Sequence, residues 1–356
     1  AAFDDAEARA RALGNGFEMA TAQNNRCLVR QHLGELRRAG ECYREAAQSY
    51  LDAGEIEHRA TPLSNWATAA VQLGEPDAAL HALHEAREIR EGSRSDRSLG
   101  NVYVQLALVY VRLGDWEPAL RYGLQAEQVF ARLNSPGDLS RAHRIRAIAL
   151  RELGEAGRAR EQAKLALAAA ERQGEARYLA PALSELARHE PDAATAAGRH
   201  LAARDLYRQD QQLPFAHREQ AAAAMRLLDA GHVDEARKLW LELGQMARTD
   251  RLPHQAEYQS IGARLAAAAG DYAQAIELVG RAVERHRRAH GGAFPSRLDE
   301  LVPQFLAAVP NDPFDGKPLR FKPLERGYVV YSIGEDGNDD GGRERIRGAT
   351  SKATVV

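Results

Sequence analysis

Hydrophobic residues recur every three to four positions along most of the chain, and short polar turns interrupt them at regular intervals. Around Gly114, for example, Leu106 and Val109 come before the turn, and Leu120 and Leu124 follow it. Apolar residues at this spacing share one face of an α-helix. The pattern therefore predicts two helices joined at Gly114, which together make a helical hairpin.

The same turn returns at a nearly constant period. Its glycines lie 40 residues apart in the first four copies and 39 apart in the last two: Gly34, Gly74, Gly114, Gly154, Gly231 and Gly270. Self-similarity at such a period indicates stacked repeats. A further copy is predicted between the fourth and fifth of these glycines, with His189 at the turn. We therefore predict seven hairpins.

Two further features recur with the turn. A glycine can adopt the left-handed conformation that closes a helix, and an Asp or Glu after it suits the positive end of the next helix. A small residue stands seven positions before the turn residue and an alanine five positions after it, which lets the paired helices approach closely. The pairs are Cys27 and Ala39, Ala67 and Ala79, Ala107 and Ala119, Ala147 and Ala159, Ala182 and Ala194, Ala224 and Ala236, and Ala263 and Ala275.

Because the turn glycine, both small positions and the period recur together, residues 15–290 resemble the tetratricopeptide repeat (TPR) family, in its variant of about 40 residues. The resemblance implies a mainly α fold, a right-handed α-solenoid whose concave face is lined by the first helix of each hairpin and holds a peptide. It also implies binding rather than catalysis. The family's Lys/Asn carboxylate clamp is absent, so a ligand that ends in a free carboxylate is not implied.

In this register the concave groove is lined by first-helix positions thirteen, ten and six residues before each turn. Asparagines there suit hydrogen bonds to a peptide backbone, arginines suit carboxylates, and methionine offers an adaptable apolar contact. The same positions include Val104 and Ala221. An ordinary solvated surface is the alternative at each position. We expect a protein or peptide ligand with an acidic segment, bound by Asn24, Thr68, Asn101, Arg141, Arg144, Arg218, Met225 and Arg264.

Composition narrows the classes of function. The chain of 356 residues has 48 basic and 50 acidic side chains, interspersed along it, and a net charge of −2. No basic face is implied, so nucleic acid is not an expected partner. No run of about 18 apolar residues occurs, so no membrane span is expected in this chain. Because the sequence begins at Ala1 without Met, we expect that a natural N-terminal signal, anchor or domain is missing.

Side chains suited to catalysis or redox chemistry are few. Cys27 and Cys42 fall in the paired helices of the first hairpin, which leaves a disulfide and two buried free thiols open; we expect the thiols. His286 and His290 share a helical face, but Arg287 stands where a zinc-protease motif needs a glutamate. Neither a glycine-rich phosphate loop nor a nucleophile elbow occurs. We therefore expect no enzymatic activity.

The sequence changes character after His290. Six prolines exclude long helices, and two β-rich stretches, 319–321 and 327–333, predict an antiparallel hairpin. An acidic, glycine-rich loop follows at 334–342. We therefore expect a solenoid at residues 1–290 and a small α+β cap at residues 291–356.

Three motifs of this region, at 293–302, 311–321 and 331–337, come in the order found in the C-terminal globular part of the major pseudopilin of type II secretion. Residues 280–345 resemble that family without its hydrophobic stem, and we expect them to close the open end of the solenoid. The resemblance implies Ca²⁺ in the acidic loop, with Asp336 as principal ligand and Asp339 or Asp340 as later ones. Crowded carboxylates suit this cation, although the EF-hand spacing is absent. A solvated acidic turn is the alternative.

The expected function is that of a non-enzymatic scaffold that binds a protein segment in the groove, with a cap that holds calcium. Two alternatives are a sensor region of a larger signalling protein and a secretion or assembly factor of a bacterial cell envelope. The pseudopilin-like cap favours an extracytoplasmic location, and a cytoplasmic one stays open.

Overall fold

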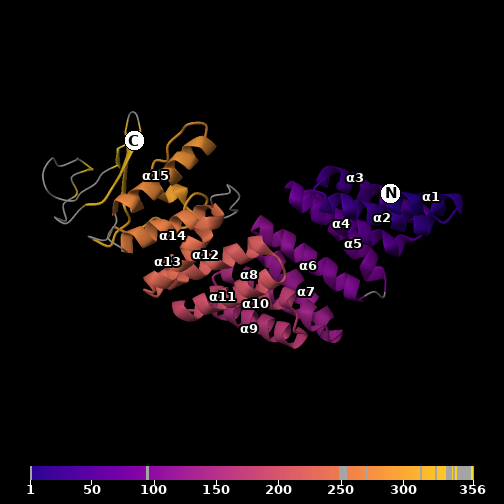
Figure 1. The fold of residues 1–356 in the computed structure, drawn as a ribbon. Coiled ribbons are helices and arrows are strands. Elements are labelled where there is room, and N and C mark those ends of the chain that lie inside the picture. Colours follow the sequence, from indigo (N-terminus) through magenta and orange to yellow (C-terminus); the bar gives the residue numbers. More distant parts are fainter. Residues whose placement is uncertain are drawn as a thin grey trace. The chain divides into compact units, whose positions relative to one another are not determined.

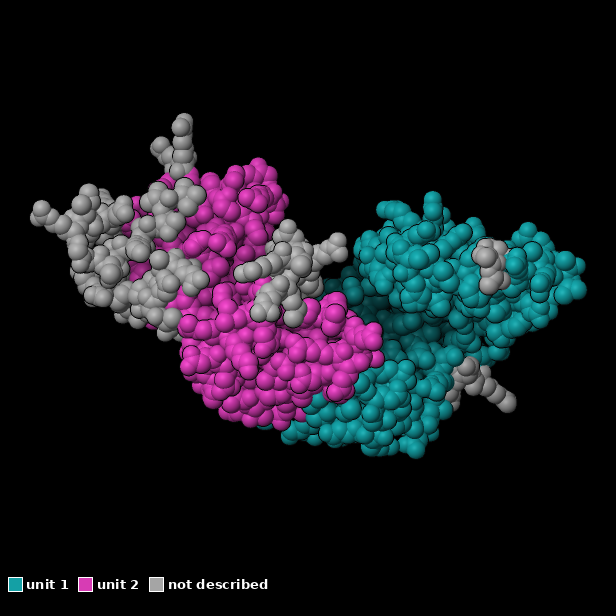
Figure 2. Space-filling model, in the orientation of Figure 1, with its two compact units in different colours: residues 1–185 teal, residues 186–356 magenta. Residues whose placement is uncertain are grey.

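A computed structural model describes residues 2–93, 96–247, 255–268, 272–312, 315–324, 327–333, 339, 341–342 and 354–355. The described residues are mostly helical, with fifteen α-helices, one 3-10 helix and three short strands (Figure 1). The chain divides into two compact units, residues 1–185 and residues 186–356, which Figure 2 colours teal and magenta. They are called unit 1 and unit 2.

Unit 1 is a stack of helices in which each helix packs on the next. From α2 to α9 the helices contain 17 or 18 residues. Their bounds are α1 (Ala2–Ala12), α2 (Gly16–His32), α3 (Leu36–Asp52), α4 (Ile56–Leu73), α5 (Pro76–Gly92), α6 (Asp96–Leu113), α7 (Trp116–Arg132), α8 (Pro136–Glu152) and α9 (Ala156–Gln173). The next helix, α10 (Ala176–Arg188), crosses the boundary between the units.

A left-handed residue closes successive turns of unit 1 about every twenty residues. Asn134 does so with φ 47°, and the others are glycines: Gly14, Gly34, Gly54, Gly74, Gly114, Gly154 and Gly174. Glycine is favoured here because a Cβ clashes in this conformation. The 40-residue repeat is thus two modules of one helix and one turn. The sequence pattern identifies only alternate turns, because the small residues that mark a hairpin flank only those.

The predicted hairpins are present in both units. In the third hairpin, Ala107 of α6 and Ala119 of α7 are both fully buried, as the close approach of the paired helices requires. Packed pairs in unit 1 are α2 with α3, α4 with α5, α6 with α7 and α8 with α9; in unit 2 they are α12 with α13 and α14 with α15.

In the fifth copy the predicted register is wrong by two residues. Ala194 is exposed, whereas Ala196 is fully buried. The reason is the helix cap. Asp192 caps α11 by accepting the N–H of Thr195 at 2.7 Å, and the buried alanine follows this cap by four residues, as Ala119 follows the cap of α7. Without a turn glycine, the sequence does not mark where this helix begins.

Cys27 and Cys42 are joined in a disulfide, so the expectation of two free thiols is wrong. The bond connects α2 to α3, and the two Cα atoms lie 5.5 Å apart. Both cysteines are buried. Cys27 occupies the small-residue position at a helix crossing, and the close backbone approach at that position is what brings the sulfur atoms within bonding reach.

Unit 2 continues with helices and ends in the cap. Its bounds are α11 (Ala193–Gln209), α12 (Leu213–Asp229), α13 (Val233–Ala247), α14 (Gln255–Ala268), α15 (Tyr272–Ala289), the 3-10 helix η1 (Leu298–Leu301), β1 (Arg320–Pro323), β2 (Tyr328–Tyr331) and β3 (Thr354–Val355). The last α-helix ends at Ala289, yet the compact units divide the chain after residue 185. The predicted domain boundary at residue 290 therefore stays a prediction.

The cap is built on a small antiparallel sheet. β1 and β2 form the predicted hairpin, in which Arg320 pairs with Tyr331 and Pro323 with Tyr328. β3 pairs with the other edge of β2. Val279 of α15 lies in one buried cluster with Tyr328 and other apolar residues of the cap. The cap is therefore anchored on the last helix of the stack by a shared core.

Candidate binding surface

The first helices of successive hairpins pack on one another. In unit 1 these contacts join α2 to α4, α4 to α6, and α6 to α8; in unit 2 they join α12 to α14. The described second helices of unit 1 show no comparable packing on one another. The first helices therefore lie on the shorter, inner side of the stack in unit 1. Their common surface, made by α2, α4, α6 and α8, is called the first-helix face.

Two of the predicted groove residues, Asn101 and Arg141, contact each other across this face, and others bond to neighbouring polar groups. Asn65 of α4 donates to the side-chain oxygen of Asn24 on α2 at 3.1 Å. Arg141 of α8 donates to the side-chain oxygen of Asn101 on α6 at 3.2 Å. The exposed Thr68 donates back to a carbonyl of its own helix, α4. The first two of these hydrogen bonds link first helices one repeat apart.

The predicted lining positions Val104 and Ala221 are wrong. Val104 is fully buried, and Ala221 of α12 is 3% exposed. Val104 belongs to the main apolar cluster of unit 1. At the position ten residues before the turn, an apolar side chain rotates into the core, while the polar Asn24 of the first repeat stays half-buried at the surface.

The arginines of α8 lie beside a buried carboxylate. Asp138 is 4% exposed, and it forms ion pairs with Arg97 of α6 at 3.0 Å and with Arg141 at 3.5 Å. The hydroxyl of Ser135 donates to the same carboxylate. Arg144 lies one turn further along α8 and is half-buried. Part of the positive charge predicted for this region is therefore already balanced within the protein.

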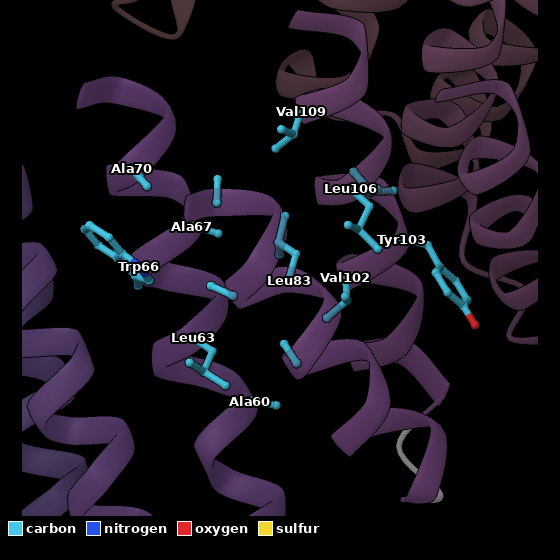
Figure 3. Packing of buried hydrophobic residues seen from close by; sticks show 14 of the residues in the cluster. Ala60, Leu63, Trp66, Ala67, Ala70, Leu83, Val102, Tyr103, Leu106 and Val109 are labelled. Carbon is cyan, nitrogen blue, oxygen red and sulfur yellow. The ribbon is translucent and has the colours of Figure 1, made fainter. Parts of the chain in front are cut away.

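A pocket of about 170 Å³ opens between α4 and α6, over α5. Its walls are mostly apolar, and polar residues stand at its rim: Ala67, Thr68, Val71, Gln72, Leu83, Gln105, Leu108, Val109 and Arg112. Figure 3 shows the packing beneath it, with Leu83 between the helix of Ala67 and the helix of Leu106. Two of the lining residues, Thr68 and Leu108, stand six residues before the turn glycines Gly74 and Gly114, at predicted groove positions.

Gln105 is a polar residue of this pocket that the groove pattern does not identify. Its side-chain oxygen is buried and accepts no hydrogen bond from the described residues. A buried acceptor without a donor costs free energy unless water or a ligand supplies one. A signal was present in the sequence, because Gln105 is the one amide in the mainly apolar run 102–111.

In unit 2 the predicted arginines contact acidic neighbours. Arg264 of α14 forms an ion pair with Asp229 at 2.8 Å, and its guanidinium lies 3.8 Å from the sulfur of Met225 on α12. Arg218 forms an ion pair with Glu219 at 3.3 Å. The guanidinium of Arg218 also lies 5.2 Å from the ring centre of Phe215. These contacts bring Met225 and Arg264 together. The neighbouring carboxylates neutralise much of the positive charge of Arg218 and Arg264.

Of the predicted calcium ligands, only Asp339 is among the described residues; Asp336 and Asp340 lie outside them. The carboxylate of Asp339 accepts hydrogen bonds from the Gly341 N–H and the Tyr331 hydroxyl, both at 3.0 Å. The Gly341 N–H, with help from Tyr331 and Arg320, lowers the pKa of Asp339. The described residues contain no group of three or more His, Cys, Asp or Glu side chains placed to hold a metal.

None of the described helices is long and apolar enough to cross a membrane.

The two histidines noted in the sequence, His286 and His290, stack with ring centres 4.0 Å apart. His286 is 7% exposed and packs edge-on against Phe305. Their role in the described structure is to support the base of the cap.

The geometry defines a helical-repeat protein: an α-solenoid of hairpins with a small sheet at its C-terminus. Residues 58–132, which span α4 to α7, match the tetratricopeptide repeat family. The pocket between α4 and α6 lies within the matched residues. No curated protein sequence matches the chain.

Solved structures share the fold at low sequence identity. The apo form of RapI is 15% identical, with 77% of this chain and 99% of that chain covered and a TM-score of 0.58. A signal transduction ATPase with numerous domains from Pyrococcus horikoshii, which has a TPR sensor, is 16% identical with a TM-score of 0.63. That match covers 83% of this chain but only 45% of the ATPase. A Rap protein in complex with competence and sporulation factor is 14% identical, with coverages of 81% and 79% and a TM-score of 0.55.

Proposed function

We propose that this protein is a non-catalytic scaffold that binds a segment of a partner protein along the first-helix face of unit 1. The observation that carries the proposal is the pocket between α4 and α6, whose buried Gln105 oxygen lacks a donor. A bound segment would place one apolar side chain among Val71, Leu83 and Leu108. A backbone N–H of the segment would donate to Gln105.

Magnitudes favour the pocket as an anchor. Burying one branched apolar side chain stabilises a complex by about 1.5–3 kcal/mol. Satisfying a buried acceptor adds roughly 1 kcal/mol. Contacts on the flat remainder of the face contribute less, because those polar groups already bond to one another or to water.

An acidic segment suits the charges near the pocket. Arg112 at the rim is exposed and forms no ion pair with a described residue. Arg141 and Arg144 lie further along the first-helix face, on α8. We infer that the ligand runs along the face with its apolar anchor at the pocket and its acidic residues toward these arginines.

The fold neighbours agree with a binding role. The Rap protein was solved in complex with competence and sporulation factor, and the archaeal ATPase has its TPR region as a sensor. The second favours an alternative in which this chain is the sensor region of a larger signalling protein. A cell-envelope role and an extracytoplasmic location remain a further proposal, to which the buried disulfide adds weight, because disulfides persist in oxidising compartments.

The test uses a displayed library of random peptides. We expect selected peptides to combine acidic residues with one large apolar residue, and their affinity to fall more than tenfold in Leu108→Arg. Leu124→Arg is the matched control, since Leu124 is an exposed leucine on the second helix α7. Equal binding to both variants would contradict the pocket.

Charge reversal tests the acidic segment separately. In Arg141→Glu/Arg144→Glu the selected acidic peptides should bind at least tenfold more weakly. Asp138 keeps its ion pair with Arg97 and its hydrogen bond from Ser135. The new carboxylate of Arg141→Glu repels Asp138, so the circular dichroism of the variant is checked before its binding is measured. If the peptides bind unchanged, the groove has no preference for acidic ligands.

A further inference from the structure

Unit 2 holds a second cavity, of about 400 Å³, that the proposed function does not use. It lies between α15 and strand β2 of the cap, and Gln259 of α14 contributes to its wall. Ile276, Tyr328 and Val330 give it an apolar lining. A cavity of this size and lining is typical of sites for small organic molecules.

A glycine keeps the cavity open. Gly280 lies on α15 within the lining, and its carbonyl accepts a hydrogen bond from the Tyr328 hydroxyl at 3.0 Å. A Cβ at this position would already lie 3.4 Å from that hydroxyl oxygen. Any larger side chain would occupy the cavity, so the space depends on this residue.

The charges at the rim do not cancel. Glu277 pairs with Arg281 at 2.7 Å, and Glu284 pairs with Arg287 at 2.8 Å. The two remaining arginines of the rim, at positions 285 and 288, form no ion pair with a carboxylate among the described residues. The cavity therefore has an excess of positive charge.

One buried arginine of the lining also has a donor without an acceptor. Arg285 donates to the carbonyl of Phe305 at 2.6 Å, but its buried Nε donates to no acceptor in the described part of the chain. Burial lowers the pKa of Arg285 because it removes water from the charged guanidinium, a cost that a nearby anion offsets.

We propose that this cavity binds a small anionic amphiphile, a molecule with an apolar body and a carboxylate head. The body lies against Tyr328 and Val330, and the head pairs with Arg285 and Arg288. The site is independent of the first-helix face of unit 1. It makes the junction of cap and solenoid a ligand-binding site in its own right.

Calorimetric titration with sodium decanoate tests the proposal. Decanoate should bind with one-to-one stoichiometry, about tenfold or more tighter than decyltrimethylammonium, and its affinity should fall as salt rises. Arg288→Glu should weaken binding about tenfold, and Arg288→Lys should keep it within about threefold, because the charge is retained. Arg237→Glu is the matched control, since Arg237 is exposed on α13 of the same unit.

A second variant tests whether decanoate binds inside the cavity. Gly280→Leu should abolish decanoate binding by filling the cavity, with the helical circular dichroism checked first. Arg288 is exposed, so its variants should fold and decide the outcome even if Gly280→Leu does not. Equal affinity for the anionic and cationic amphiphiles, or unchanged decanoate binding in Arg288→Glu, would overturn the proposal.

Discussion

Single residues stabilise this fold in two main ways: small residues let helices pack closely, and buried polar residues form hydrogen bonds with their neighbours. Several helical glycines illustrate the first role, because an aromatic ring of the neighbouring helix rests on them. A Cβ on Gly40 would lie 2.0 Å from the ring of Trp66, and one on Gly262 would lie 2.8 Å from the ring of Trp240. These contacts could not be predicted from periodicity, since they depend on how a neighbouring helix is rotated. Asp312 in the cap illustrates the second role.

Ala119→Leu should destabilise the protein by about 1–3 kcal/mol, because it inserts volume into a closed helix crossing. Ala119 and Ala107 are both fully buried on packed helices. Urea denaturation measures the loss. Ala131→Leu, an exposed position on the same helix, should change stability by less than about 0.5 kcal/mol. Equal effects of the two variants would show that the crossing is not tight.

Asp312→Ala should destabilise the cap by about 1–3 kcal/mol, because it leaves the buried N–H of Ile333 without an acceptor, while Arg320 keeps its ion pair with Asp315. Asp312 is fully buried and accepts hydrogen bonds from Arg320, the Ser332 hydroxyl and the Ile333 N–H, at 2.8 to 2.9 Å. Limited proteolysis of the cap measures the effect. Asp299→Ala, at an exposed position of η1, is the control, and similar cleavage of both would contradict the role of Asp312.

The cap should loosen in acid. The hydrogen bond from Arg320 lowers the pKa of Asp315, and the N–H of Gly341 lowers that of Asp339. A carboxyl whose pKa is lower in the folded state stabilises it above the ordinary aspartate range, and this stabilisation is lost as pH falls through the lowered pKa. Near-ultraviolet circular dichroism of the cap tyrosines should therefore stay constant at neutral pH and decline in acid. In Arg320→Met the decline should begin at higher pH; an unchanged profile would dismiss this linkage.

At the scale of helices, the sequence predicts a great deal because the determining signals are local. The turn glycines, the small residues and the apolar spacing all lie within one hairpin, so the hairpins and the antiparallel strands of the cap follow from them. The sequence-based predictions fail where a local signal is missing, or where a feature depends on how separate helices pack together. The start of α11 has no turn glycine, and the inward rotation of Val104 and the pocket around Gln105 arise only when α4, α5 and α6 pack together.

The disulfide between α2 and α3 should stabilise the first hairpin. It closes a loop with a sequence separation of 15 residues, for which the chain-entropy model gives about 3 kcal/mol. Cys27→Ser/Cys42→Ser should lower the melting temperature. A reducing agent should lower the melting temperature of the natural protein but leave that of the double variant unchanged. A melt of the natural protein that is insensitive to reductant would show that the bond contributes nothing.

At the scale of the whole molecule, the repeat pattern predicts the class of fold but not how the chain divides. The division after residue 185 falls within α10, in the fifth hairpin, whose turn has His189 in place of the glycine. The sequence shows that this copy is irregular, but the irregularity alone does not predict that a compact unit ends there. The pocket on the first-helix face is likewise not predictable from the repeat alone. The repeat predicts which helices form the inner face of the stack, whereas the depth of the pocket depends on individual side chains such as Leu83 and Leu108.

Calcium binding by the acidic loop is a property that whole-molecule melting can test. Ca²⁺ at a hundredfold excess over its dissociation constant should stabilise the folded protein by about 2.7 kcal/mol. The melting temperature should rise with calcium and fall with chelator, and Asp336→Ala should remove the difference while Asp299→Ala keeps it. Magnesium should substitute poorly, because its octahedral shell tolerates an irregular loop less well. A melt indifferent to calcium would leave only a solvated acidic turn.

The regular placement of left-handed residues has a consequence for how such a chain can vary. A segment that runs from Gly34 to Gly74, or from Gly74 to Gly114, begins and ends at equivalent points of the backbone. Duplicating or deleting such a segment at the gene level leaves every remaining helix in phase with its neighbours. The surface offered to a partner can therefore lengthen or shorten in whole steps, while the hairpins on either side keep their packing.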